Sequence, residues 1–215
     1  MSALSKRERI RHQVTITGEV VDAETGKTIA RARVEIVDGP AEFSQGLDLK
    51  AMLYRDGWRA MAERPDRTST APSGHFHFLD LPDGEYRLAA SLPDSGTRYG
   101  QRTTEAVTVS RDAAGKVRIA RVHVSLPPTV LKGCITDRST GTPIVLAEVR
   151  VRGSGEHTFS DNHGEYRLIA LEQGRRKVQV SARGYQRADE PVEVEVEVEL
   201  QRGDTRTLHF SLEAE

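Results

Sequence analysis

The feature that most constrains this chain is an internal repeat. Residues 18–36 read GEVVDAETGKTIARARVEI, and residues 133–151 read GCITDRSTGTPIVLAEVRV. A second block follows each of these, so that residues 70–91 align with residues 160–181. The offset is 115 positions in the first block and 90 in the second, so repeat one carries 25 extra residues between its blocks. Repeated sequence predicts repeated structure, with a core of similar design in each copy.

Each copy has the pattern of short β-strands joined by turns. Val34 and Ile36 alternate with charged residues, which is the period of a half-buried strand. Turn-forming residues at 22–26 and at Gly74 separate the apolar runs. We therefore predict an all-β fold of two tandem β-sandwiches, the first with a helical insertion. The expected order is an N-terminal arm (1–12), a first domain (13–126) with its insertion (40–67), a proline-rich linker (127–130) and a second domain (131–215).

At these residues both copies resemble the carboxypeptidase regulatory-like domain, a transthyretin-like, Ig-like β-sandwich. The matching pattern is G-x-V-x-D-x-x-T-G-x-P-[IL]-x-x-A-x-V, continued by T-x-x-x-G-x-[FY]-x-[FL]. The second copy keeps the proline as Pro143, where the first has Thr28, and it has Gly184-Tyr185 after Ser181. The resemblance implies a fold and no active site, because the family is a scaffold found beside peptidases and in transporters, adhesins and large assemblies.

Composition excludes several classes of function. The chain has 31 basic and 32 acidic residues, a net charge of -1, and we expect no nucleic-acid partner from so even a balance. Its single cysteine, Cys134, allows no internal disulfide and is expected to be a buried strand residue. No segment has the apolar length of a membrane span or the pattern of a signal peptide. We therefore expect a cytoplasmic protein, within a large assembly, that does not insert into membranes.

The most tempting metal ligands are His75 and His77. Residues two apart on a strand share a face, so both rings point the same way. Phe76 and Phe78 then occupy the core face, and the second copy has charged side chains at the two matching positions. We interpret the histidines as solvent-facing and predict no metal and no cofactor.

Two acidic segments also invite a functional interpretation. Residues 161–165, DNHGE, faintly resemble a calcium loop, but a turn stabilised by Asp161 explains them better. Four glutamates alternate with valines over 192–199. Their acidic face is either a solvated face that prevents edge aggregation or a docking ladder for a basic partner. The acids in question are Glu193, Glu195, Glu197 and Glu199.

The insertion is the segment that the repeat does not need. Leu47, Ala51, Tyr54, Trp58 and Met61 fall at spacings of four, three, four and three, which is one face of a helix. This segment contains the only tryptophan of the chain, and the second copy manages without it. The helix either caps an open end of its own sandwich or binds another protein. We predict that these five residues bind a partner.

The function expected from the sequence is that of a non-catalytic structural or adaptor protein. It would mediate protein–protein contacts within a larger assembly, of a phage-tail-like or secretion-associated kind. We expect no enzyme, because no nucleophile with a nearby base is visible, and no small-molecule ligand. The alternative is a carbohydrate-binding or adhesion module, whose candidate stacking residues are Tyr54, Trp58, Tyr99 and Tyr185.

Overall fold

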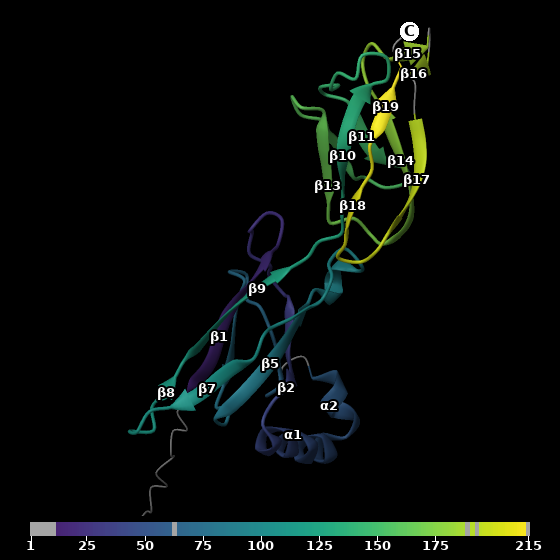
Figure 1. Cartoon of the computed structure of the whole chain (residues 1–215). Coiled ribbons are helices and arrows are strands. Elements are labelled where there is room, and N and C mark those ends of the chain that lie inside the picture. The colour runs from purple at the N-terminus through teal and green to yellow at the C-terminus, as the bar shows by residue number, and fades with distance from the viewer. Residues whose placement is uncertain (1–11, 62–63, 188–189, 192–193, 214–215) are drawn as a thin grey trace, which may run out of the picture. The chain divides into compact units, whose positions relative to one another are not determined.

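The computed structural model describes residues 12–61, 64–187, 190–191 and 194–213 (Figure 1). The described chain forms two compact units. The first holds residues up to 21, 27–90 and 103–124, and the second holds 22–26, 91–102 and residues from 125 onward. Two segments of the first repeat therefore belong to the second unit. Of the predicted N-terminal arm only His12 is described, and the domain boundaries drawn from the sequence stay predictions.

The first repeat contains two sheets. One has the strand order β4-β1-β9, and the other has the order β3-β2-β5-β7-β8, with β6 beside β5. A 3-10 turn, η1 (Pro93–Ser95), follows β5. The strands are β1 (Val14–Asp22), β2 (Arg33–Asp38), β3 (Arg67–Ser69), β4 (His75–Leu79), β5 (Gly84–Ser91), β6 (Arg102–Thr103), β7 (Val107–Arg111), β8 (Val117–Arg118) and β9 (Ala120–Leu126).

Alternating strands supply the core of the first repeat. Burial in β4 follows the predicted period of two, with Phe76 and Phe78 buried and the two histidines exposed. The phenylalanine rings meet edge to face, with centroids 6.1 Å apart. Ile16 and Val20 on β1 and Val34 on β2 are buried as well. The hydrophobic alternation in the sequence thus determines which face of each strand is buried.

The second repeat has the same strand order as the first. The order β13-β10-β18, with β19 also beside β10, corresponds to β4-β1-β9, and β12-β11-β14-β17 corresponds to β3-β2-β5-β7. Both β18 and β19 run parallel to β10. The strands are β10 (Val130–Asp137), β11 (Glu148–Val151), β12 (His157–Phe159), β13 (Glu165–Ile169), β14 (Gly174–Ser181), β15 (Gln186–Arg187), β16 (Glu190–Pro191), β17 (Val194–Leu200), β18 (Thr205–Thr207) and β19 (Phe210–Leu212). The predicted all-β fold of two tandem sandwiches is confirmed.

One glycine of the repeat pattern is explained by a close approach of the backbone. A Cβ atom at Gly133 would lie 1.7 Å from the carbonyl oxygen of Leu208 and 2.9 Å from the ring of Tyr166. The matching Gly18 faces the carbonyl oxygen of Val122, 2.2 Å from where its Cβ would be. Both positions require glycine because the backbone of the neighbouring segment comes too close to leave room for a Cβ atom.

The insertion is helical, as predicted, but it forms two helices. They are α1 (Ala41–Tyr54) and α2 (Asp56–Ala60). Arg55 separates them with φ of 50°, and its N–H donates to the carbonyl oxygen of Ala51 at 2.9 Å. A left-handed residue at this point ends the first helix. A continuous helical stripe from Leu47 to Met61 is therefore wrong.

Candidate functional site

The insertion is anchored to its own unit through the start of α1. Phe43 is buried and meets the ring of Tyr86 edge to face, with centroids 5.5 Å apart. Pro40, just before the helix, lies so close to Gly84 that a Cβ there would be 2.3 Å from the proline ring. The first turn of α1 is therefore packed onto the start of β5. Phe43 extends the predicted stripe by one turn and was missed by the sequence analysis.

The five predicted partner-binding residues lie mainly on the inner side of the insertion. Leu47, Ala51, Trp58 and Met61 are half-buried, whereas Tyr54 is 49% exposed. Leu47 lines a groove against the first sandwich. The two hypotheses for the insertion, a cap on its own sandwich and a helix that binds another protein, therefore concern different faces of it. The predicted stripe is placed to cap its own unit, and its role in binding a partner stays a prediction.

The only tryptophan is enclosed by its neighbours. Tyr54 stacks on Trp58 with ring centroids 6.2 Å apart and an angle of 17° between planes. The guanidinium of Arg64 lies 4.9 Å from the Trp58 ring centroid. Asp66 holds that guanidinium through two hydrogen bonds, of 3.0 and 2.7 Å. The arrangement is a cation–π contact that fixes α2 against the segment after it.

The outer side of α1 carries a second apolar surface. Leu49, Met52 and Leu53, here named the helix patch, have exposed fractions of 70, 75 and 74%. Their spacing of three and one places them on the same side of the helix. The sequence pattern had placed Leu53 at the margin of the predicted stripe, and Leu49 and Met52 were not singled out, although their spacing was visible.

A groove runs between α1 and the strands beside it. Its volume is about 870 Å³. Phe43, Leu47 and Lys50 line it from the helix, and Ser69 and His77 line it from β3 and β4. The side chains that meet there mix apolar, basic and hydroxyl groups.

The second repeat exposes apolar residues at the corresponding edge. Phe159, at the end of β12, matches Ser69 in the alignment of the repeats. Val145 and Leu146 match the alanine and arginine at 30–31. These three residues, here named the edge patch, are 53, 46 and 72% exposed. The edge beside the insertion is polar, and the edge without an insertion is apolar.

Two histidines of the first sandwich have ordinary polar partners. Nδ1 of His75 lies 3.1 Å from the carbonyl oxygen of Ser73, and Nδ1 of His123 lies 3.1 Å from a carboxylate oxygen of Glu19. Within the described chain, no three His, Cys, Asp or Glu side chains are grouped closely enough to hold a metal ion.

Two other candidate residues are placed by the structure as follows. The Asp161 carboxylate accepts the backbone N–H groups of His163 and Glu165 at 2.8 and 2.9 Å. These bonds hold the pKa of Asp161 below its ordinary value. It stabilises a turn, as we interpreted it. Cys134 lies in β10 but is only half-buried, which corrects the expectation of a buried residue.

The acidic face of β17 meets a basic face in its own sheet. Glu195 contacts Lys177 at 2.8 Å and Arg152 at 2.9 Å, and these contacts hold its pKa below the ordinary value. Glu199 lies 3.5 Å from Arg175. Glu193 lies outside the described residues. Lys177 and Arg175 on β14, and Arg152 just after β11, thus pair with two of the four glutamates, and both interpretations of the acidic face stay predictions.

Each repeat has the same aspartate–tyrosine pair. Asp22 accepts the Tyr99 hydroxyl at 2.6 Å, and Asp137 accepts the Tyr185 hydroxyl at 2.9 Å. Both aspartates also accept the amides of the turn that follows them. Burial raises the pKa of Asp22, but the bonds from Tyr99 and the amides outweigh this and lower it. Tyr99 and Tyr185 were two of the sugar-stacking candidates predicted from the sequence, and their hydroxyls make these internal bonds.

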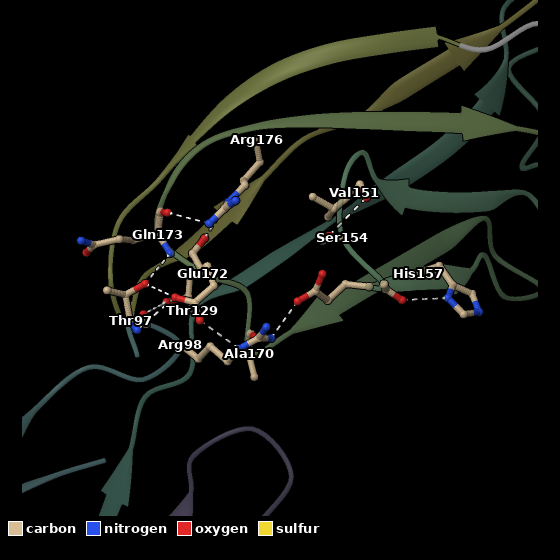
Figure 2. Close-up of polar contacts among 12 residues, drawn as sticks. Thr97, Arg98, Thr129, Val151, Ser154, His157, Ala170, Glu172, Gln173 and Arg176 are labelled. Atoms are coloured by element: carbon tan, nitrogen blue, oxygen red, sulfur yellow. Dashed lines mark hydrogen bonds and ion pairs between the residues drawn. The ribbon is translucent and has the colours of Figure 1, made fainter. Parts of the chain in front are cut away.

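Arg98 is the centre of a polar cluster in the second unit (Figure 2). Its guanidinium donates to the carbonyl oxygen of Ala170 at 2.7 Å and pairs with Glu156 at 2.8 Å and Glu172 at 3.1 Å. The Thr97 amide donates to Glu172 at 3.0 Å, and its hydroxyl donates to the same carboxylate. These contacts fix residues 91–102 within the unit.

The family model agrees with this architecture. The model of the carboxypeptidase regulatory-like domain matches residues 15–122 and 130–213, and the chain belongs to this family. No curated protein sequence matches the chain. No helix among the described residues has the length and apolarity to cross a membrane.

Three solved structures are similar to the chain at low identity. The shaft pilin SpaA of Lactobacillus rhamnosus GG is 11% identical, with a TM-score of 0.41, and the match covers 95% of this chain and 98% of that one. The Bacillus anthracis TIE protein is 12% identical, with a TM-score of 0.39. That match covers 94% of this chain but 34% of the TIE chain. The minor pilin GBS52 of Streptococcus agalactiae is 14% identical, with a TM-score of 0.32 and coverages of 93 and 95%. Values this low carry no information about function.

Proposed function

We propose that the protein is a non-catalytic structural or adaptor protein whose insertion docks onto a protein partner. The observation that carries the proposal is the helix patch. Leu49, Met52 and Leu53 are at least 70% exposed on a segment that the second repeat lacks. Clustered large apolar side chains on a surface helix lower the free energy of binding when a partner covers them.

The chemistry of the described residues supports a binding role over catalysis. The candidate groups singled out from the sequence have structural partners, as Asp22 has with Tyr99 and Glu195 with Lys177. Catalytic sites concentrate perturbed titrating groups in one cleft. Here the carboxyls with lowered pKa cap turns or pair with cations in the two repeats, far apart in the sequence.

The kind of assembly is a further part of the proposal. A phage-tail-like or secretion-associated machine, with the protein in the cytoplasm, is carried over from the sequence. Support comes from the family, which recurs in large assemblies as a scaffold, and from the two sandwiches built on one plan.

A carbohydrate-binding or adhesion module is the second candidate, favoured by one observation. Tyr54 is half-exposed and stacked on Trp58, and such rings bind sugar faces. Arg64 covers one face of Trp58, which weakens this candidate. Titration with glycans while following Trp58 fluorescence tests it, and unchanged emission would remove it.

Affinity purification from the native cell tests the adaptor proposal. The intact chain is compared with the triple variant Leu49→Glu, Met52→Glu, Leu53→Glu. The matched control is Val37→Glu with Ile119→Glu, at apolar positions that are 55 and 52% exposed elsewhere in the first unit. We expect the same partners with the intact chain and the control, and their loss with the triple variant. Partners that persist on the triple variant, or none on the intact chain, would contradict the proposal.

A further inference from the structure

We propose that the groove between α1 and the first sandwich binds an extended peptide segment of a partner protein, one that carries an acidic and a basic side chain about four residues apart. The groove lies on the inner side of α1, whereas the helix patch lies on the outer side. The inference therefore goes beyond the proposed docking role of the insertion and does not depend on it. It assigns a second, separate binding site to the same segment.

Two free strand edges border the groove, one from each sheet of the first repeat. β3 is the outermost strand in one sheet order, and β4 is the outermost strand in the other. Ser69 on β3 and His77 on β4 both line the groove. In an antiparallel ladder, the backbone groups of every second residue point away from the neighbouring strand. On an outermost strand these groups are open to a further strand.

The register shows that Ser69 and His77 are such residues. The Thr70 N–H donates to the carbonyl oxygen of Ala32, so the N–H and C=O of the adjacent Ser69 face away from β2. The carbonyl oxygen of Gly74 accepts a bond from β1, so every second residue from there bonds to β1 and His77 faces away. Among the described residues, the backbone groups of Ser69 and His77 have no hydrogen-bond partner. A peptide backbone supplies the donors and acceptors that both edges lack.

The groove has room for a chain beside these edges. Its volume of about 870 Å³ falls within the range of ligand-binding pockets, about 300 to 1,000 Å³. Phe43 anchors the first turn of α1, and beyond that turn Leu47 on the helix and Leu79 on β4 line the open space. Leu79 is 39% exposed. The helix thus stands beside the two edges without closing them, and it adds an apolar wall.

Gly46, in the middle of α1, points to an occupant from outside the chain. Glycine inside a helix is unfavourable relative to alanine. A Cβ atom at this position would meet nothing within 4 Å, so packing within the chain does not require glycine here. The residue lines the groove. Glycine at such a position allows the backbone of a ligand to approach the helix closely.

Two unpaired charges define the side chains that the occupant carries. Glu42 and Lys50 line the groove, and neither has an ion-pair partner among the residues that the structure describes. Apart from the imidazoles of β4, the other charged groups of the lining are paired within the chain. These pairs are Arg64 with Asp66, Arg67 with Glu35, and Asp80 with His12. The groove therefore offers one free acid and one free base to a ligand.

The spacing of the two charges matches an extended peptide. Glu42 and Lys50 are eight positions apart on α1, which is about 12 Å at a rise of about 1.5 Å per residue. An extended chain covers this distance in about four residues, at about 3.4 Å each. Alternate side chains of such a chain point to the same side. A basic side chain can thus meet Glu42, an apolar one the space at Gly46, and an acidic one Lys50.

Fluorescence anisotropy of two labelled peptides with the full chain tests the proposal. The peptides are Glu-Thr-Leu-Thr-Lys and Lys-Thr-Leu-Thr-Glu, with both ends blocked, and they differ only in the order of their charges. Because only one order matches the groove, we expect one peptide to bind about 10-fold more tightly than the other. The double variant Glu42→Lys with Lys50→Glu should reverse this preference.

Gly46→Leu fills the groove, and Gly57→Leu is its matched control. Both glycines lie on helices of the insertion, and a Cβ atom at either would meet nothing within 4 Å. Gly57 does not line the groove. We expect Gly46→Leu to weaken binding of the better peptide at least 10-fold, roughly, and Gly57→Leu to leave it unchanged.

A third variant tests the pairing with the strand edge. Ser69→Pro removes an N–H that faces away from β2, so it keeps the bonds within the sheet. The loss of one backbone bond to the peptide should weaken binding about 10-fold. Circular dichroism confirms that each variant is folded.

Five results would overturn the inference. They are no binding of either peptide up to about 1 mM, equal binding of both, a preference that the charge-reversed variant keeps, equal binding to the Gly46 and Gly57 variants, and unchanged binding to Ser69→Pro. Self-association of the intact chain that Gly46→Leu abolishes would identify a second copy as the occupant and would also overturn it. The triple variant of the helix patch should bind the better peptide like the intact chain. Failure of the peptide site therefore leaves the adaptor proposal standing.

Discussion

Replacing Gly133 by alanine tests the structural account of the repeat pattern. The new Cβ would lie 1.7 Å from the carbonyl oxygen of Leu208 and 2.9 Å from the ring of Tyr166. The backbone at 208 has to move. The hydroxyl of Tyr166 donates to that same carbonyl at 2.7 Å, and the Leu208 N–H donates to Lys132 at 2.8 Å. One methyl group thus disturbs packing and two hydrogen bonds together.

The expected cost follows from these contacts. Overpacking a close-packed site costs about 1 to 3 kcal/mol. Weakening a buried hydrogen bond costs a further 1 to 3 kcal/mol, roughly. We therefore expect the free energy of unfolding to fall by about 3 kcal/mol. In a unit of about 100 residues this lowers the melting temperature by about 12 to 24 °C.

Differential scanning calorimetry measures the effect against a matched control. At Gly155 a Cβ would meet nothing within 4 Å, so Gly155→Ala should change the free energy of unfolding by less than about 0.5 kcal/mol. Equal melting temperatures for the two variants would refute the claim that β10 needs glycine for the passage of the Leu208 segment.

Three further predictions concern polar contacts. Tyr99→Phe removes the hydroxyl bond to Asp22 and should lower the free energy of unfolding by about 1 to 2 kcal/mol in urea titrations; no change would show that the pair is not stabilising. Bonds from Thr97, then the charge of Arg98, hold the folded pKa of Glu172 below its ordinary value. The stabilisation from Glu172 is therefore present above that ordinary pKa and is lost as the pH falls through the folded pKa. Glu172→Gln should make the free energy of unfolding fall less on acidification, and an unaltered pH profile would contradict this. Arg64→Ala uncovers the ring of Trp58 and should shift its fluorescence to the red, whereas Arg59→Ala should not; equal spectra for both would reject the cation–π contact.

The fold was predictable because the residues of the repeat pattern meet structural requirements of the backbone. Gly133 marks the close approach of the Leu208 backbone, and Asp137 marks a capped turn, so the signature residues are those that the backbone path requires. The alternation in β4 identified its buried face correctly. Local patterns of this kind need no knowledge of distant contacts.

Contacts between distant segments were not predictable in the same way. In the first repeat Tyr99 makes the bond that Tyr185 makes in the second. Eight positions separate Tyr99 from Ser91, however, whereas four separate Tyr185 from Ser181. The extra residues hide the match from an alignment of the repeats. The ion pairs of Arg98 with Glu156 and Glu172 also join residues more than 50 positions apart (Figure 2), and no local sequence pattern indicates them.

The insertion was predictable in type and only partly in geometry. Helical spacing identified its inner stripe, but the left-handed Arg55 ended α1 early. The helix is apolar on two sides, and a search for one amphipathic face finds only the first. The residues of the helix patch stand out by their exposure to solvent, which the structure shows and the sequence does not.

Site-specific photocrosslinking in the native cell tests the central claim most directly. A photoreactive residue is placed at Leu53 in one strain and at Val37 in another, since the two side chains are 74 and 55% exposed in the same unit. A docking insertion predicts a protein adduct from position 53 and none from position 37. Adducts at neither position, or equal adducts at both, would contradict the claim that the outer face of α1 binds a protein partner.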